Sequence, residues 1–438
     1  MSRLERRTVF SSIARQSDEE CTPDIIMVAG FGNTGIVITE EGVVVVDNTP
    51  MTSSRAVEAI RARTQAPIHT IIYTHGHSDH AWAAGAFVED ARERGHPKPR
   101  VIAHELVPKR FDRYKKLAGY NRYINGIQGG RRYRRPQDDG QSSSSRAAGF
   151  GSSGIVFTEK GGEQFLPSEA VYPDITYSDA TQFKLGGLTF ELYHYIGETD
   201  DGTWVWIPER KTAIVGDLMV GVCPNIGNPF KLQRYELEWA EGLERIAGKN
   251  PDFLIPGHGR VLRGEEIQEI CLGTAKLLRH IHDEVIRLLN EGCWIEEILG
   301  RVKIPEDLAS KRWLAPNYGC PTYIIHGIHR RYAGWYNGNP SELFPSKSSE
   351  IAAEVVRLNG VERLIECARK LQQEGNTQLA LHLADFAIKG TEDSAKRKEA
   401  LLLKAELLDA RADAETNSIA RNIFLVGAEE AEQEAHSL

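Results

Sequence analysis

The chain has few cysteines, and their spacing does not suggest a structural role for them. None of the six forms a C-x-x-C pair: they are Cys21, Cys223, Cys271, Cys293, Cys320 and Cys367. A zinc ribbon and a disulfide scaffold are therefore not expected, and a reduced, cytoplasmic location is the simplest expectation. Apolar runs of about 18 residues are also lacking, so no segment is expected to span a membrane. The first residues, Met1–Arg7, lack the apolar stretch of a signal peptide.

A basic surplus is lacking as well. The formal net charge of the 438 residues is −8, so nucleic acid is not expected as a partner. The cluster Arg131–Arg135 is an exception, but it adjoins a run of four serines that ends at Ser145, which favours a mobile loop over a binding patch. No G-x-S-x-G nucleophile motif occurs, and the Gly-rich stretch Gly149–Gly154 lacks the lysine of a phosphate-binding loop.

Four strong metal ligands lie within six residues, in the pattern H-x-H-x-D-H. They are His75, His77, Asp79 and His80. The preceding apolar, β-branched segment Pro67–Tyr73 predicts a buried strand, so these residues leave the end of a strand and enter a loop. Open α/β layers place their sites at such strand ends. Imidazoles and carboxylates crowded together in this way predict one divalent cation or two.

Three further candidate ligands follow predicted strands, each after a glycine. Glu198 lies in Gly-Glu-Thr-Asp-Asp, Asp217 in Val-Gly-Asp and His258 in Pro-Gly-His-Gly. Glycine allows a sharp turn and a close approach to a metal. At the first position, Asp200 and Asp201 are alternatives to Glu198. Asp47, at the end of a valine run, either holds a ligand histidine by its second nitrogen or is an ordinary turn acid.

Together these motifs resemble the metallo-β-lactamase fold superfamily. The usual second motif there has a histidine, and Glu198 at this position resembles the alkyl sulfatase branch. The block Tyr332–Pro345, with its Gly-Trp-Tyr-Asn-Gly-Asn-Pro core, is similar to the signature that opens the alkyl sulfatase dimerisation domain. The resemblance covers roughly residues 20 to 390.

The resemblance implies a site for two Zn²⁺ ions. His75, His77 and Glu198 would hold one, Asp79, His80 and His258 the other, and Asp217 would bridge them. Asp79 and Asp217 would thus also serve catalysis. The extra negative charge of Glu198 could admit Mn²⁺ or Fe²⁺. Metal-activated hydroxide would attack an ester of a small molecule, and sulfate esters are the leading expectation.

Sulfate needs donors and cations around its oxygens. The candidates for substrate binding are Asn33, Asn225, Arg234, Tyr323 and His326. Tyr323 stands near the place where the alkyl sulfatases have a histidine, and this departure leaves other substrates open. They are another ester, a lactone, a thioester or a phosphodiester. A mono-iron oxygenase on the same scaffold and a scaffold protein without activity are further alternatives.

The order of predicted elements favours an αββα sandwich followed by an all-α region. Residues 1–20 are expected to form a tail, 21–290 the catalytic domain and 291–438 a helical dimerisation domain. Segment 121–165, rich in Gly, Arg and Ser, is predicted to be a lid or mobile loop. Helices are expected over 81–94, 351–358, 361–374, 377–388 and 394–422. They predict a homodimer through the C-terminal helices, with a helical cap on the same subunit as the alternative. The further lipid-carrier-like domain of full alkyl sulfatases is not expected in this sequence.

Overall fold

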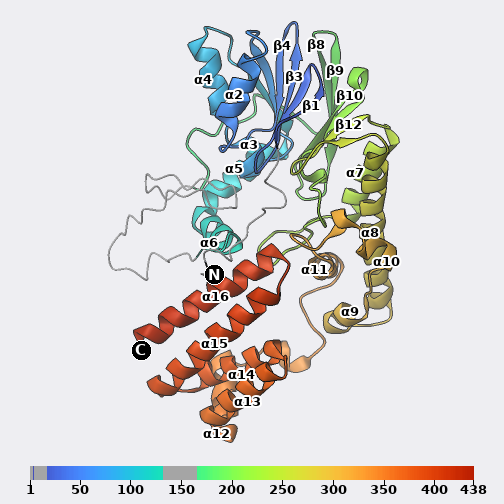
Figure 1. Cartoon of the computed structure of the whole chain (residues 1–438). Helices are drawn as coiled ribbons and strands as arrows, with labels where there is room; N and C mark the ends of the chain where they lie inside the picture. Colours follow the sequence, from blue (N-terminus) through green and yellow to red (C-terminus); the bar gives the residue numbers. More distant parts are fainter. Residues whose placement is uncertain (1–2, 4–16, 132–164) are drawn as a thin grey trace. The chain divides into compact units, whose positions relative to one another are not determined.

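The computed structural model describes residue 3, residues 17–131 and residues 165–438. The chain separates into two compact units (Figure 1). Of the described residues, the sandwich unit contains 17–122 and 165–334, and the helical unit contains residue 3, residues 123–131 and residues 335–438. The predicted lid falls mostly on residues 132–164, which lie outside the described residues. Its first part is helical, because α6 covers Ala118–Gln128.

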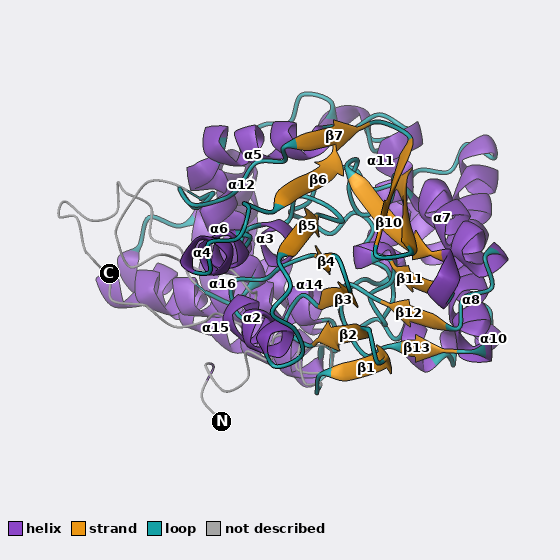
Figure 2. Ribbon diagram, turned by 90° about the horizontal axis from the view of Figure 1, so that it is seen from above, coloured by secondary structure: helices purple, strands orange, loops and turns teal. Residues whose placement is uncertain are grey.

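Two sheets face each other in the sandwich unit (Figure 2). The first sheet has its strands in sequence order: β1 (Glu19–Thr22), β2 (Ile25–Val28), β3 (Thr34–Thr39), β4 (Gly42–Val46), β5 (Ile68–Ile72), β6 (Arg100–His104) and β7 (Ile175–Tyr177). The second sheet has the order β13 (Leu262–Arg263), β12 (Phe253–Ile255), β11 (Thr212–Ile214), β10 (Gly202–Ile207), β9 (Leu188–Tyr195) and β8 (Ala180–Leu185). Both sheets mix parallel and antiparallel pairs.

The run of valines in β4 explains the layering. Val43 and Val45 join an apolar core on the helix side of the first sheet, whereas Val44 and Val46 join the core between the sheets. A strand with both faces buried needs a continuous apolar run rather than alternation. Ile214 and Phe190 of the second sheet complete the core between the sheets.

Helices cover the outer face of each sheet (Figure 2). Beside the first sheet lie α2 (Ser53–Arg61), α3 (Ser78–Ala81), α4 (Gly85–Glu93) and α5 (Leu106–Lys116). Beside the second lie α7 (Glu236–Gly248) and α8 (Glu265–Asn290). The chain continues with α9 (Ile295–Arg301), α10 (Glu306–Ala309) and α11 (Pro321–Tyr332), and α9 and α11 contact α8. Short 3-10 turns are η1 (Pro208–Arg210), η2 (Gly216–Leu218) and η3 (Arg312–Leu314). The predicted αββα architecture is thus confirmed.

The helical unit has a core of its own. Its helices are α12 (Ser348–Asn359), α13 (Val361–Gln373), α14 (Thr377–Gly390), α15 (Ser394–Ala414) and α16 (Ser418–Ser437), preceded by the turn η4 (Pro340–Glu342). Arg3 forms ion pairs with Asp409 and Glu432 of this unit. The predicted all-α region is confirmed.

Two helix predictions were wrong in their boundaries. The helix expected over 394–422 is two helices, because the side chain of Asn417 caps α16 by accepting from the backbone N–H groups of Ile419 and Ala420. The helix expected over 81–94 is likewise broken between α3 and α4. Along the described part of the chain, no helix is both long and apolar enough to cross a membrane.

Candidate metal centre

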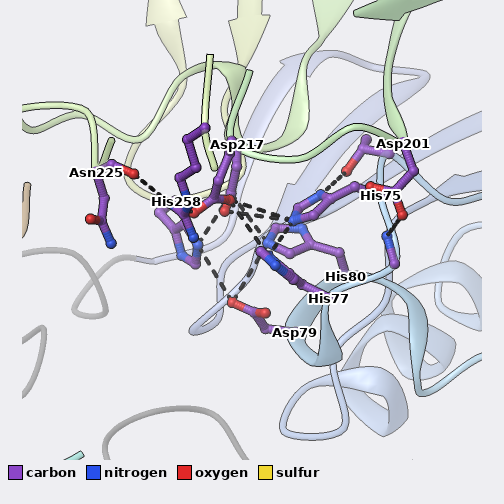
Figure 3. A network of polar contacts seen from close by, with 12 residues as sticks. His75, His77, Asp79, His80, Asp201, Asp217, Asn225 and His258 are labelled. Atoms are coloured by element: carbon purple, nitrogen blue, oxygen red, sulfur yellow. Dashed lines mark hydrogen bonds and ion pairs between the residues drawn. The ribbon is translucent and has the colours of Figure 1, made fainter. Parts of the chain in front are cut away.

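All seven predicted ligands meet at one edge of the sandwich (Figure 3). His75 and His77 lie in the loop after β5, Asp79 and His80 lie on α3, and Glu198, Asp217 and His258 follow β9, β11 and β12. They form two groups in which the candidate ligand atoms lie within 4.8 Å of one another. One group is His75, His77, Glu198 and Asp217, and the other is Asp79, His80 and His258.

Asp217 lies between the two groups. Its Oδ1 is 3.2 Å from Nε2 of His80 and 3.2 Å from Nε2 of His258, and its Oδ2 is 3.8 Å from Nε2 of His75. Asp79 Oδ2 lies 3.5 Å from Nε2 of His258 and 3.6 Å from Nε2 of His80. The carboxylate of Asp217 therefore faces both groups at once.

Glycines make this approach possible. Gly216 has a φ of 51°, and a Cβ there would lie 2.3 Å from Oγ1 of Thr74. A Cβ on Gly257 would lie 2.1 Å from Oδ1 of Asp217. Both positions thus require glycine to bring Asp217 and His258 against the loop after β5.

Hydrogen bonds fix the tautomers of three histidines. Nδ1 of His80 lies 2.8 Å from Oδ2 of Asp47, and Nδ1 of His258 faces the carbonyl oxygen of Phe31. Nδ1 of His75 lies 3.1 Å from the hydroxyl of Thr74, which itself donates to Asp47. Each Nδ1 therefore carries a proton, and each Nε2 faces the site, as in metal-binding histidines. Of the two interpretations of Asp47, the structure supports the one in which it holds a histidine.

Burial and charge shift the protonation of these groups. Burial lowers the pKa of His75, and the neighbouring His80 and His77 lower it further. Burial also lowers the pKa of His258, but Asp217 outweighs this effect and raises it to about 9. Burial raises the pKa of Asp217, but His258 and His80 hold it well below its ordinary value. The site thus gathers negative charge that a cation would balance.

The residues present fit a metal pair. Among the described residues, Nε2 of His80, Oε2 of Glu198 and Oδ1 of Asp217 are buried without a hydrogen-bond partner. Unpaired buried atoms of this kind are costly unless a ligand satisfies them. The donor set of imidazole nitrogens and carboxylate oxygens suits Zn²⁺ and other first-row divalent cations.

Asp200 and Asp201, the alternatives to Glu198, belong to a different contact. Nε of Arg110 donates to Oδ2 of Asp201 at 2.6 Å, and its Nη2 donates to Asp200. Oδ2 of Asp201 also accepts from the N–H of Gly76 at 3.2 Å. Asp201 thus holds the loop between His75 and His77 through the backbone N–H of Gly76.

The residues predicted to bind substrate differ in their contacts and in their exposure. Nδ2 of Asn33 donates to the carbonyl oxygens of Pro256 and Gly259, so it holds the loop of His258. Arg234 pairs with Glu198. Tyr323 and His326 lie on α11, where Tyr323 is half-buried and His326 is exposed.

Asn225 lies beside the cluster (Figure 3). It is 1% exposed, and the hydroxyl of Tyr318 lies within hydrogen-bonding reach of its amide. A bound ligand would satisfy the rest of the buried amide.

Two further residues lie near the cluster. Burial raises the pKa of Tyr318, and the charges of Glu198 and Asp217 raise it further. Burial lowers the pKa of Lys231 to about 8, with Arg234 acting in the same direction and Glu198 against it. Lys231 escaped the sequence prediction because it belongs to no recognisable motif, so only its surroundings reveal it.

Comparison with known families agrees with this geometry. A family model described as the metallo-beta-lactamase superfamily matches residues 27–258, which is more than half of the chain. The chain belongs to the metallo-beta-lactamase superfamily. A second model, alkyl sulfatase dimerisation, matches residues 294–434. The chain thus lies in the alkyl sulfatase branch, as the Glu198 motif and the block Tyr332–Pro345 predicted.

Two relatives align with most of the length of this chain. A linear primary-alkylsulfatase of a Pseudomonas species is 26% identical over 90% of this chain and 72% of its own length. An alkyl/aryl-sulfatase of Saccharomyces cerevisiae is 24% identical over 94% of the chain and 63% of its own length. The chain therefore spans between about three-fifths and three-quarters of these relatives.

A solved structure shows the same fold. The stereoselective inverting sec-alkylsulfatase of a Pseudomonas species superposes with a TM-score of 0.77 at 21% identity, over 96% of this chain and 66% of that one. The homologues are sulfuric ester hydrolases, and the chain is an alkyl sulfatase-like hydrolase of the metallo-β-lactamase fold.

Proposed function

We propose that the protein hydrolyses sulfate esters of alkyl chains with two divalent cations, most simply Zn²⁺. The single observation that carries this proposal is the convergence of all seven ligands in two adjacent groups that share the carboxylate of Asp217. Two cations held there would supply hydroxide at neutral pH and counter-charge for the developing anion. The complete second group supports this activity over an oxygenase that uses one iron.

The chain's own residues have distinct tasks in this proposal. Asp47 and the carbonyl of Phe31 orient the imidazoles of His80 and His258, so that both Nε2 atoms point at the site. The buried amide of Asn225 donates to a sulfate oxygen. Lys231 adds a positive charge next to it below a pH of about 8. The phenol of Tyr318, which stays protonated because its pKa is raised, is a second donor.

The helical unit supports a homodimer. The part of this unit that precedes its helices exposes two large apolar side chains, Trp335 at 77% and Phe344 at 89%, and α12 exposes Leu358 at 71%. Exposed apolar side chains of this size indicate an interaction surface. The match of this region to the alkyl sulfatase dimerisation model favours a second copy of the chain as the partner.

Substrate assays test the proposal. Dodecyl sulfate is compared with a lactone, a thioester and a phosphodiester, and inorganic sulfate release is measured together with metal content per chain. We expect sulfate release, two metals per chain, and loss of activity in His80→Ala. His69→Ala is the matched control, because His69 lies on β5 and its Nδ1 contacts the hydroxyl of Thr70 instead of a candidate ligand. Turnover of another ester without sulfate release would overturn the substrate, and one iron per chain would overturn the mechanism.

A further inference from the structure

Arg234 and Glu198 form a buried ion pair beside the first ligand group. Arg234 is 2% exposed and Glu198 is 5% exposed. Nη1 of Arg234 donates to Oε1 of Glu198 and, at 2.6 Å, to the carbonyl oxygen of Asn225. Charges at this depth are costly unless they are paired and hydrogen-bonded, so each holds the other in place.

The position of Arg234 is itself fixed by its neighbours. Nε2 of Gln233 donates to the carbonyl oxygen of Arg234 at 2.7 Å and to that of Gly327 in α11 at 3.0 Å. The chain packs closely here, because a Cβ on Gly227 would lie 2.8 Å from Cα of Gly327. The guanidinium therefore approaches Glu198 from a backbone that is anchored to α11.

The two oxygens of Glu198 face different partners. Oε1 accepts from Arg234, whereas Oε2 has no hydrogen-bond partner among the described residues. Oε2 lies 3.6 Å from Nε2 of His75 and 3.5 Å from Nδ1 of His77. Glu198 thus offers one oxygen to the site, and its second oxygen is occupied.

With Glu198 used through one oxygen, the first group offers four protein atoms to a cation. They are one nitrogen each from His75 and His77 and one oxygen each from Glu198 and Asp217. Together with one water or hydroxide they stay within the four to five ligands of a catalytic Zn²⁺, whereas Mn²⁺ favours six oxygen-rich ligands and gains more from a two-oxygen carboxylate. A carboxylate with a free second oxygen would favour the larger coordination number.

We propose that Arg234 is a positioning residue that holds Glu198 as a one-oxygen ligand and so makes the His75–His77 group selective for a cation of low coordination number such as Zn²⁺. The proposal rests on the proposed function, since it requires metal at this site. It gives Arg234 a different task from the substrate binding expected from the sequence. The guanidinium acts through Glu198 and does not contact the reacting atoms.

Metal binding to the full chain after removal of metal by a chelator tests the proposal. Zn²⁺ and Mn²⁺ are titrated separately, against a competing indicator, into wild type and Arg234→Met. We expect the ratio of zinc to manganese affinity to fall by about tenfold or more in Arg234→Met, because the second oxygen becomes available. Arg331→Met is the matched control, because it breaks an ion pair with Glu238, which is not a candidate metal ligand. Its ratio is expected to equal that of wild type.

A second pair of variants tests the route of the effect. In the Glu198→Gln background, Arg234→Met is expected to leave the ratio unchanged, because the residue through which it acts has lost its second carboxylate oxygen. Arg234→Gln keeps a donor and is expected to give an intermediate ratio, and it decides alone where Arg234→Met fails to fold. A wild-type ratio in the folded Arg234 variants overturns the inference. Absence of metal binding in wild type overturns the proposed function instead.

Discussion

Asp47→Asn is the sharpest perturbation of the site, because it replaces one oxygen atom by nitrogen and leaves every candidate ligand in place. The residue has a φ of 64°, a conformation that asparagine adopts readily and alanine does not. Its carboxylate accepts three hydrogen bonds: from Nδ1 of His80 at 2.8 Å, and from the N–H and hydroxyl of Thr74 at 2.7 and 2.6 Å. All three groups are donors.

An amide cannot accept all three. If its oxygen takes the place of Oδ1, its NH₂ faces the hydroxyl of Thr74 and Nδ1 of His80. Nδ1 of His80 can then accept a hydrogen bond from this NH₂ only if its proton moves to Nε2, the atom that faces Asp217. If the oxygen takes the place of Oδ2, the NH₂ instead meets the N–H of Thr74. Either choice leaves a buried donor without an acceptor, at a cost of about 1 to 3 kcal/mol.

Loss of such a partner typically lowers metal affinity by about 10 to 100-fold, which is about 1.4 to 2.8 kcal/mol. One effect opposes this loss. Asp47 is one of three carboxylates that raise the pKa of His80 against the effect of burial, so its removal eases proton competition. Asp217 and Asp79 raise that pKa more than Asp47 does, so this opposing effect is the smaller one.

The assay is zinc binding by competition with a chelator, with thermal unfolding of the metal-free protein beside it. We expect weaker binding of one of the two metals and a lower unfolding temperature without metal. Asp24→Asn is the control, because Asp24 pairs with Arg210 away from the cluster. Wild-type affinity for both metals in Asp47→Asn would refute the role of Asp47.

Three further predictions concern stability, substrate and assembly. Asp90→Asn leaves Arg61 buried without its partner and is expected to destabilise the protein by about 3 to 5 kcal/mol at pH 7. Burial raises the pKa of Asp90, but Arg61 and Arg94 lower it below 3.8. The stabilisation by this ion pair is therefore present above pH 3.8 and is lost as the pH falls through the lowered pKa. Urea unfolding of wild type and Asp90→Asn at pH 7 and pH 3 measures the difference. Lys231→Met is expected to raise KM for dodecyl sulfate with a smaller change in kcat. In wild type, KM should rise as the pH passes about 8, where Lys231 loses its charge. An unchanged KM and an unchanged pH profile in Lys231→Met contradict this prediction. Trp335→Asp combined with Phe344→Asp is expected to convert a dimer into a monomer in light scattering at micromolar concentration, and a wild-type monomer would exclude the dimer itself.

Much of the fold and the site could be predicted from the sequence. The valine run of β4 and the strand before His75 indicate buried strands, and an apolar run retains that meaning in any topology. The ligand pattern is equally local, because four metal ligands within six residues can be recognised without knowledge of the fold. Helix ends were predicted less well. The break at Asn417 depends on a side chain that caps the next helix, and the periodicity of apolar residues continues across it.

The sequence by itself determined which residue types stand at the strand ends, and therefore that cations belong there. Only the tertiary structure decided how each side chain is used. Asp47 and His80 are 33 positions apart, and Arg234 and Glu198 are 36 apart, yet their hydrogen bonds fix a tautomer and leave one carboxylate oxygen available. From the sequence Arg234 was expected to bind substrate, but a guanidinium binds a carboxylate as well as a sulfate. Its anchored backbone and buried partner set its task, because a charge at that depth must be paired with the nearest opposite charge.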